Sequence, residues 1–242
     1  FYSQVMGVSA NLVSLALMIA LIVDALSDPL IGYLSDNTRS RWGRRHPFMY
    51  AAALPAAIAY YFVWNPPSGL EGDALFPYIV TIAVLVRTLV TVYEIPSSSL
   101  VAEMSDDYDE RTSMLSYRYF FGWTGGTLMG AFATIFILVP TATISNGMFN
   151  VEGHGQVGAI AAVIIFIAMM VSTMGTHKMI PDLKAPPPPR QMTIGLIYRE
   201  VFETLASRSF LALFLAALFG AVAAGVSTTL SFYFSTFFWG FT

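Results

Sequence analysis

Long apolar stretches alternate with short polar segments along the whole chain. Each stretch approaches or exceeds the ~20 residues that an α-helix needs to cross a bilayer. The pattern therefore predicts six membrane-spanning helices, at residues 9–34, 47–64, 77–102, 113–139, 156–175 and 209–239. Residues 1–8 are expected to hold the end of an earlier span and a short turn, so we expect the chain to be a fragment of a longer protein.

A polar segment separates the fifth and sixth predicted spans. It contains a run of four prolines at 186–189, which must be extended or polyproline-like. Residues 194–205 are predicted to form an amphipathic helix on the membrane surface. We therefore expect a helical bundle at 1–177, a cytoplasmic proline-rich linker at 178–207 and the first helix of a second bundle at 208–242.

The composition supports a membrane protein and argues against several other classes. Of the 242 residues, 56% are hydrophobic and 11% are charged, whereas a soluble domain has about 25% charged residues. A net charge of −3 gives no basic surface for a nucleic acid, and the absence of cysteine rules out disulfides and thiolate metal sites. Because no nucleophile–base pair or phosphate-binding loop is present, we expect neither an enzyme nor a cofactor.

The basic residues predict the orientation of the chain in the membrane. Ten of the twelve Lys and Arg residues lie in the connections after the first and third spans and in the segment 178–208. The connections at 65–76 and 140–155 contain none. Because cytoplasmic loops collect Lys and Arg, the three basic connections are predicted to be cytoplasmic and the other two exoplasmic.

Two carboxylates inside the first span are its most unusual feature. Asp24 and Asp28 stand four residues apart and share one helical face, with Ser27 beside it. A carboxylate at bilayer depth costs roughly 2.5–3.5 kcal/mol, so it is kept mainly where it handles an ion, a proton or a partner. The pair suits a monovalent cation such as Na⁺, or one shared proton. Alternatively, each aspartate pairs with an arginine and only holds helices together.

The third span carries a second polar stripe. Arg87, Thr91, Glu94 and Ser98 are spaced by four, three and four residues, which keeps them on one helical face. Glu94 lies at a depth similar to that of Asp24, where it is able to accept hydrogen bonds from substrate hydroxyl groups. Two turns separate Arg87 from Glu94, so a bridge through water or substrate is easier than a direct pair.

Arginines near the cytoplasmic side form two further candidate groups. Arg118, inside the fourth span, either reaches a carboxylate of the cavity or extends to the membrane interface. Asp36 follows the first span, and Arg44 and Arg45 precede the second. These three residues are expected to form a charged cytoplasmic gate, although plain topology also explains the arginines.

Two segments resemble the glycoside–pentoside–hexuronide:cation symporters, the melibiose-permease-like branch of the major facilitator superfamily. Residues 23–48, VDALSDPLIGYLSDNTRSRWGRRHPF, resemble the signature of that family's second helix. Residues 93–123, YEIPSSSLVAEMSDDYDERTSMLSYRYFFGW, resemble its fourth helix, the following loop and its fifth helix. The resemblance implies an all-α membrane protein with a major facilitator superfamily helical bundle. This chain would be a fragment with six full transmembrane helices, from the end of helix one through helix seven of twelve.

The resemblance also implies a cation site. It maps the carboxylates of the family's second helix to Asp24 and Asp28, and a fourth-helix threonine to Thr91. Ser27 stands where the melibiose type has an asparagine. This departure leaves Na⁺, Li⁺ and H⁺ open as the coupling ion.

A substrate site is implied on the neighbouring residues. Glu94 corresponds to the family's sugar-binding acid and Arg118 to its fifth-helix arginine. Ser98 replaces a sugar-stacking tryptophan, so galactoside specificity is not expected. Arg87, on the same stripe, completes the expected substrate-binding set.

Together these features predict a cation-coupled secondary active symporter of a sugar, glycoside or related polar solute, which works by alternating access. A carrier of an amphiphile such as a lysolipid and a non-transporting membrane sensor or scaffold are the alternatives. The expected partners are the solute, a monovalent cation and the lipid bilayer, with no nucleic acid. We expect a monomeric, multi-pass plasma membrane protein, such as one of a bacterial inner membrane.

Overall fold

A computed structural model describes residues 1–141, 144–183, 193–234 and 238–239. These residues belong to two compact units, 1–190 and 191–242, each of which is described by itself. The proline run at 186–189, predicted to be extended, lies outside the described residues. The predicted division into bundle, linker and second bundle stays a prediction.

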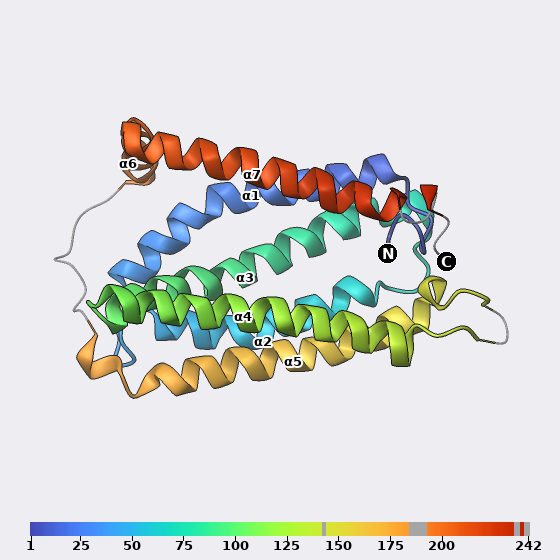
Figure 1. The fold of residues 1–242 in the computed structure, drawn as a ribbon, viewed down its shortest axis with the longest axis horizontal. Helices are drawn as coiled ribbons and strands as arrows, with labels where there is room; N and C mark the ends of the chain where they lie inside the picture. Colours follow the sequence, from blue (N-terminus) through green and yellow to red (C-terminus); the bar gives the residue numbers. More distant parts are fainter. Residues whose placement is uncertain (142–143, 184–192, 235–237, 240–242) are drawn as a thin grey trace. The chain divides into compact units, whose positions relative to one another are not determined.

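Long helices make up the described part of the first unit (Figure 1). They are α1 (Ala10–Asn37), α2 (His46–Trp64), α3 (Phe76–Met104), α4 (Tyr108–Phe132) and α5 (Val151–His177). A π-helical turn, η2 (Ala133–Ile137), continues α4. Short 3₁₀ turns lie in the connections, at η1 (Gly72–Leu75), η3 (Gly147–Phe149) and η4 (Ile180–Asp182).

The second unit contains a short helix and a long one in its described residues. The short helix, α6 (Ile194–Leu205), coincides with the predicted amphipathic helix. Arg199 and Glu203 form an ion pair one turn apart on it, at 2.7 Å. The long helix, α7 (Arg208–Tyr233), corresponds to the sixth predicted span.

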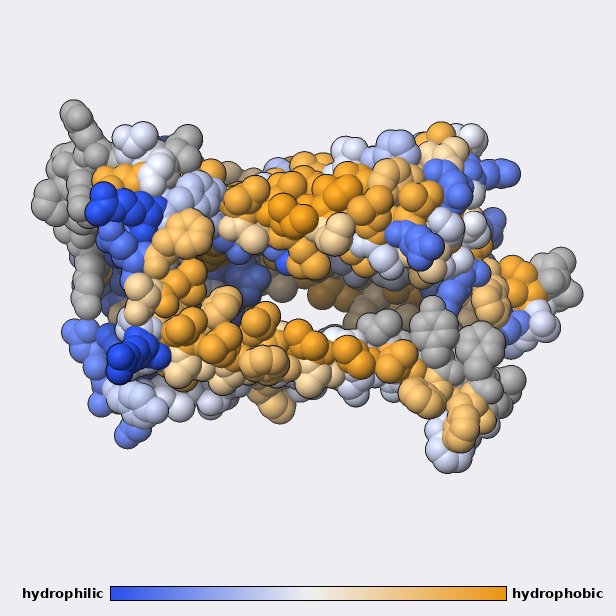
Figure 2. All heavy atoms as spheres, turned by 90° about the horizontal axis from the view of Figure 1, so that it is seen from above, coloured by the Kyte–Doolittle hydropathy of each residue, from blue (hydrophilic) through white to orange (hydrophobic). Residues whose placement is uncertain are grey.

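Six helical segments in the described part of the chain are long and apolar enough to cross a membrane. They correspond to the six predicted spans, which are therefore confirmed as apolar helices. Large apolar side chains such as Leu21, Ile22 and Leu26 are more than half exposed on α1, as expected of a surface that faces lipid. Figure 2 shows hydrophobic residues along the helices and hydrophilic residues gathered near the helix ends.

The helix ends differ from the predicted span ends by several residues. α4 begins at Tyr108 rather than at 113, because Asp107 caps it by accepting a hydrogen bond from the Glu110 backbone N–H at 2.9 Å. α5 begins at Val151 rather than at 156, since Asn150 accepts from the Gly153 backbone N–H at 3.1 Å. Hydrophobicity marks where a helix lies in lipid, whereas polar caps decide where it begins.

Residues 1–8 form turns, which include the predicted short turn, and their place at the end of an earlier span stays a prediction. Gly7 has a φ of +72°, which interrupts any helical run before α1. Val8 then turns inward and packs with Ala16 of α1 and with Leu75 and Ile79 next to it.

Helix packing in the first unit relies on small residues. α3 contacts both α1 and α2, and α2 also contacts α5. The face of α2 toward its neighbours is rich in buried alanines, which allow close approach of helix backbones. α4 contacts α3 but contributes no buried residue. The pairing of α1 with α3 is what brings their polar stripes together.

Candidate functional site

A polar hollow of about 620 Å³ lies between α1 and α3. Asp24 and Asp28 line it from α1. The lining from α3 includes all four members of the predicted stripe: Arg87, Thr91, Glu94 and Ser98. Six predicted site residues from two helices therefore share one cavity.

Asp24 is buried and has partners for both carboxylate oxygens. Thr91 donates its hydroxyl to Oδ1 at 2.9 Å, and Arg87 donates Nε to Oδ2 at 2.9 Å. A second Arg87 nitrogen, Nη2, also donates to Oδ2. Charge-assisted contacts of this kind are stronger than neutral hydrogen bonds. For Asp24, the structure therefore matches the alternative in which an aspartate pairs with an arginine.

Asp28 has a different environment from Asp24. Its Oδ1 atom is buried and has no hydrogen-bond partner within the described part of the chain. A buried carboxylate oxygen without a donor is costly, and a bound cation relieves that cost. Ser27 donates its hydroxyl to the Asp24 backbone carbonyl at 3.1 Å and is not among the residues that line the hollow.

Arg118 connects α4 to the polar stripe of α3. It donates Nη1 to the Ser98 hydroxyl at 2.6 Å and Nη2 to Glu94 Oε1 at 3.3 Å. Of the two sequence-based alternatives for Arg118, the structure shows the contact with a carboxylate. The Arg118 and Glu94 side chains are 35% and 59% exposed, so neither is enclosed by the described residues.

Arg87 and Glu94 do not pair directly in the described structure, in agreement with their separation of two helical turns. Arg87 turns to Asp24 on α1, whereas Glu94 turns to Arg118 on α4. The expectation missed this because it considered one helix alone, and the partners lie on neighbouring helices. Arg87 is consequently joined to the aspartate pair, and its predicted substrate role stays a prediction.

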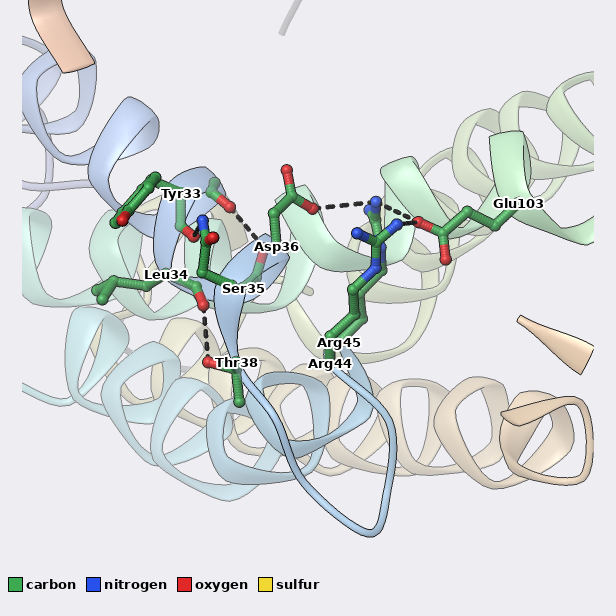
Figure 3. A network of polar contacts seen from close by, with 10 residues as sticks. Tyr33, Leu34, Ser35, Asp36, Thr38, Arg44, Arg45 and Glu103 are labelled. Carbon is green, nitrogen blue, oxygen red and sulfur yellow. Dashed lines mark hydrogen bonds and ion pairs between the residues drawn. The ribbon is translucent and has the colours of Figure 1, made fainter. Parts of the chain in front are cut away.

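The predicted gate residues come together near the loop between α1 and α2 (Figure 3). Arg45 lies 3.1 Å from Asp36 Oδ1 and 2.5 Å from Glu103 Oε1. Arg44 also pairs with Glu103, at the end of α3. The centre of the network is thus Glu103, which the sequence interpretation missed.

The Glu103 side chain is only 5% exposed, against 47% for that of Asp36. One signal could have identified it, because Glu103 directly follows the third predicted span, and an acid at that boundary favours a cationic partner. The four arginines of the loop between α1 and α2 were the available candidates for that partner. Whether this network gates transport stays a prediction.

Comparison with known proteins identifies the family. The family described as MFS/sugar transport protein matches residues 1–242. The chain belongs to this family. The chain is 34% identical over 179 residues to the uncharacterized symporter sll1374 of Synechocystis, covering 72% of the chain and 32% of that protein.

Two further relatives carry more specific names. The isoprimeverose transporter of Lactiplantibacillus pentosus is 28% identical, covering 72% of the chain and 36% of that protein. The sodium-dependent lysophosphatidylcholine symporter 1 of Mus musculus is 34% identical over 109 residues, covering 43% of the chain and 20% of that protein. The chain therefore spans about a third or less of the length of these relatives.

These matches confirm the resemblance to the cation symporters and the all-α fold. The family consists of transporters and not of enzymes, as the sequence predicts. Together with the six apolar helices, family membership makes the chain part of a multi-pass integral membrane protein.

Proposed function

We propose that this chain supplies the first helical bundle of a cation-coupled symporter for a sugar, glycoside or related polar solute. One observation carries the proposal. The hollow between α1 and α3 brings Asp24, Asp28 and Thr91 beside Glu94 and Ser98, inside helices that are apolar enough to cross a bilayer. Ionisable groups at membrane depth are costly and mark ion or substrate pathways.

The cation ligands proposed are Asp24, Asp28 and Thr91, with Ser27 as an additional candidate. Carboxylate and hydroxyl oxygens suit a hard monovalent cation, and the unpartnered oxygen of Asp28 supports this assignment. The coupling ion is Na⁺, Li⁺ or H⁺. The word sodium in the mouse relative's name is consistent with the first of these.

The solute is proposed to bind beside the cation, at Glu94, Arg118 and Ser98. A carboxylate accepts hydrogen bonds from hydroxyl groups, and a guanidinium group donates several in a fixed geometry. The partly exposed Arg118–Glu94 pair offers a hydrogen-bond donor and a hydrogen-bond acceptor to one ligand. A relative named for the transport of isoprimeverose supports a sugar or glycoside as the solute.

Transport would then proceed by rocking of two bundles around a site at mid-membrane. Cation and solute each raise the affinity for the other by the same factor, since the coupling free energy is reciprocal. We further propose that Asp36, Arg44 and Arg45, with Glu103, act as the cytoplasmic gate. Their network would close one end of the pathway in one conformation and separate in the other.

The test is solute accumulation in membrane vesicles that contain the full-length protein. A Na⁺, Li⁺ or H⁺ gradient is imposed, and Asp28→Asn is compared with the wild type. We expect Asp28→Asn to abolish gradient-driven accumulation, because it removes the charge of the proposed ion ligand. Asp109→Asn, which removes an exposed acid in the first turn of α4, serves as the control. Wild-type accumulation by Asp28→Asn would contradict the proposal.

An amphiphile is the second candidate solute. The mouse relative is named for lysophosphatidylcholine, and Ser98 provides no aromatic ring for stacking on a sugar. Competition distinguishes the two candidates in the same vesicles. A pentose, a hexose or a disaccharide lowers uptake of a labelled sugar in the first case, and lysophosphatidylcholine itself is taken up in the second.

A further inference from the structure

Arg87 is positioned like a cation bound to the aspartate pair. Two of its nitrogen atoms donate to the same oxygen of Asp24, while Thr91 occupies the other oxygen. Asp24 is therefore fully satisfied by protein groups alone. Asp28, four residues further along α1, keeps a buried oxygen without a partner in the described structure.

The exposure of the two charged partners differs sharply. The Asp24 side chain is 11% exposed, whereas that of Arg87 is 43% exposed. The guanidinium group is thus the less buried member of the pair, and on leaving Asp24 it would remain beside the polar side chains of Glu94 and Ser98, which line the same hollow. Arg87 also shares the hollow with Glu94, two turns further along α3.

Charge balance gives a reason for such an arrangement. In their ionised forms, Asp24, Asp28 and Glu94 together with Arg87 and Arg118 carry a net charge of −1. One monovalent cation would neutralise the group. Without Arg87 the same residues would carry −2, which is expensive at bilayer depth when no ion is bound.

We propose that Arg87 is a built-in counter-cation, which holds Asp24 while no ion is bound and is displaced when Na⁺ or Li⁺ binds. This inference rests on the proposed symport function. A guanidinium group is weakly hydrated and attached to the chain, so it competes with a dissolved ion at little entropic cost. The displaced Arg87 would then face the hollow and donate to the hydroxyl groups of the solute. Ion binding would in this way prepare the solute site.

The experiment measures ion affinity and solute affinity separately in the purified full-length protein. Isothermal titration with NaCl or LiCl, without solute, gives the ion affinity. Arg87→Gln is expected to bind the ion about 10-fold more tightly or better, since a competing cation is removed, a change equivalent to about 1.4 kcal/mol. The same variant is expected to bind the solute more weakly. Loss of a merely structural ion pair would not raise ion affinity and lower solute affinity together, so the opposite changes in the two affinities are the result that supports the proposal.

Two further variants complete the design. Arg87→Lys keeps a positive charge but loses the two-nitrogen contact, so ion affinity is expected to rise by a smaller factor. It serves as the test if Arg87→Gln does not elute as a folded, monodisperse protein. Arg199→Gln removes a 73% exposed arginine of α6 and is expected to match the wild type.

The outcomes separate this inference from the proposed function. If no cation gradient drives solute uptake by the wild type, the symport function itself fails. If Na⁺ or Li⁺ drives uptake but the Arg87 variants bind the ion no more tightly than the wild type, only the counter-cation role is overturned. Uptake driven by protons alone would likewise overturn the exchange with an alkali cation and leave symport intact.

Discussion

Glu103, near the end of α3, forms ion pairs with both Arg44 and Arg45, and its side chain is almost fully buried. Among the described residues, Asp36 forms an ion pair with Arg45, and its side chain is about half exposed. Removing one partner from a buried ion pair costs about 3–5 kcal/mol, because it leaves a buried charge without compensation. An exposed pair contributes only about 0–1 kcal/mol. The two acids of one network should therefore differ strongly in their effect on stability.

We accordingly expect Glu103→Gln to lower the thermal unfolding midpoint of the detergent-solubilised full-length protein far more than Asp36→Asn does. Each substitution removes one negative charge and keeps the side-chain size nearly constant, so the two variants control for each other. Equal shifts of the midpoint would show that burial of Glu103 does not determine the strength of the network.

The residue scale also shows what the sequence could predict of the site. Helical spacing placed Asp24 and Asp28 on one face of α1. It placed Thr91 and Glu94 on one face of α3, and both faces line the hollow. The partner of Arg87 could not be predicted in the same way. Asp24 is 63 positions away in the chain, and the contact depends on how α1 and α3 are rotated against each other. A single helix does not determine that rotation.

Among the elements, α2 and α5 meet through glycines that leave no room for a side chain. A Cβ atom on Gly158 of α5 would lie 2.4 Å from Cβ of Trp64, at the end of α2. A Cβ on Gly155 would lie 2.6 Å from the side-chain oxygen of Asn65. Because Trp64 Cβ is fixed by the backbone of α2, the helices would have to separate to accommodate a methyl group.

Gly158→Ala is therefore expected to destabilise the bundle by about 1–3 kcal/mol, the usual cost of overpacking. Gly175→Ala is the matched control on the same helix, since nothing lies within 4 Å of its added Cβ. It should be neutral or stabilising by up to about 1 kcal/mol, because alanine favours a helix over glycine. Thermal unfolding of the two variants in detergent measures the difference. A Gly158→Ala variant as stable as Gly175→Ala would contradict the close packing of α2 on α5.

The elements themselves were more predictable than their packing. Each apolar stretch is long enough to indicate a spanning helix, and α6 was located to the residue by its amphipathic pattern. The beginnings of α4 and α5 were not, because their caps, Asp107 and Asn150, lie outside the apolar stretches. The short turn predicted within residues 1–8 is present at Gly7, although the segment carries too little periodicity to place the turn at one residue.

For the whole molecule, the distribution of basic residues predicts which helix ends face the cytoplasm. The hollow lies within the bilayer only if the connections at 38–45 and 105–107 lie on one side and those at 65–71 and 138–150 on the other. The helix bounds satisfy this alternation within the first unit, because each helix from α2 to α5 reverses the direction of the one before it (Figure 1). The side on which each connection lies still rests on the positive charges alone.

The absence of cysteine from all 242 residues makes this orientation directly measurable. Ser68→Cys introduces a thiol into the exposed connection after α2, and Asp109→Cys introduces one into the exposed first turn of α4. In intact cells, a membrane-impermeant maleimide is expected to label Ser68→Cys and not Asp109→Cys. Permeabilised cells provide the control, because both thiols should then react. Any cysteine in the remainder of the full-length protein is first replaced. Labelling of Asp109→Cys alone in intact cells would show the opposite orientation. It would also contradict the assignment of Glu103, Arg44 and Arg45 to a cytoplasmic gate.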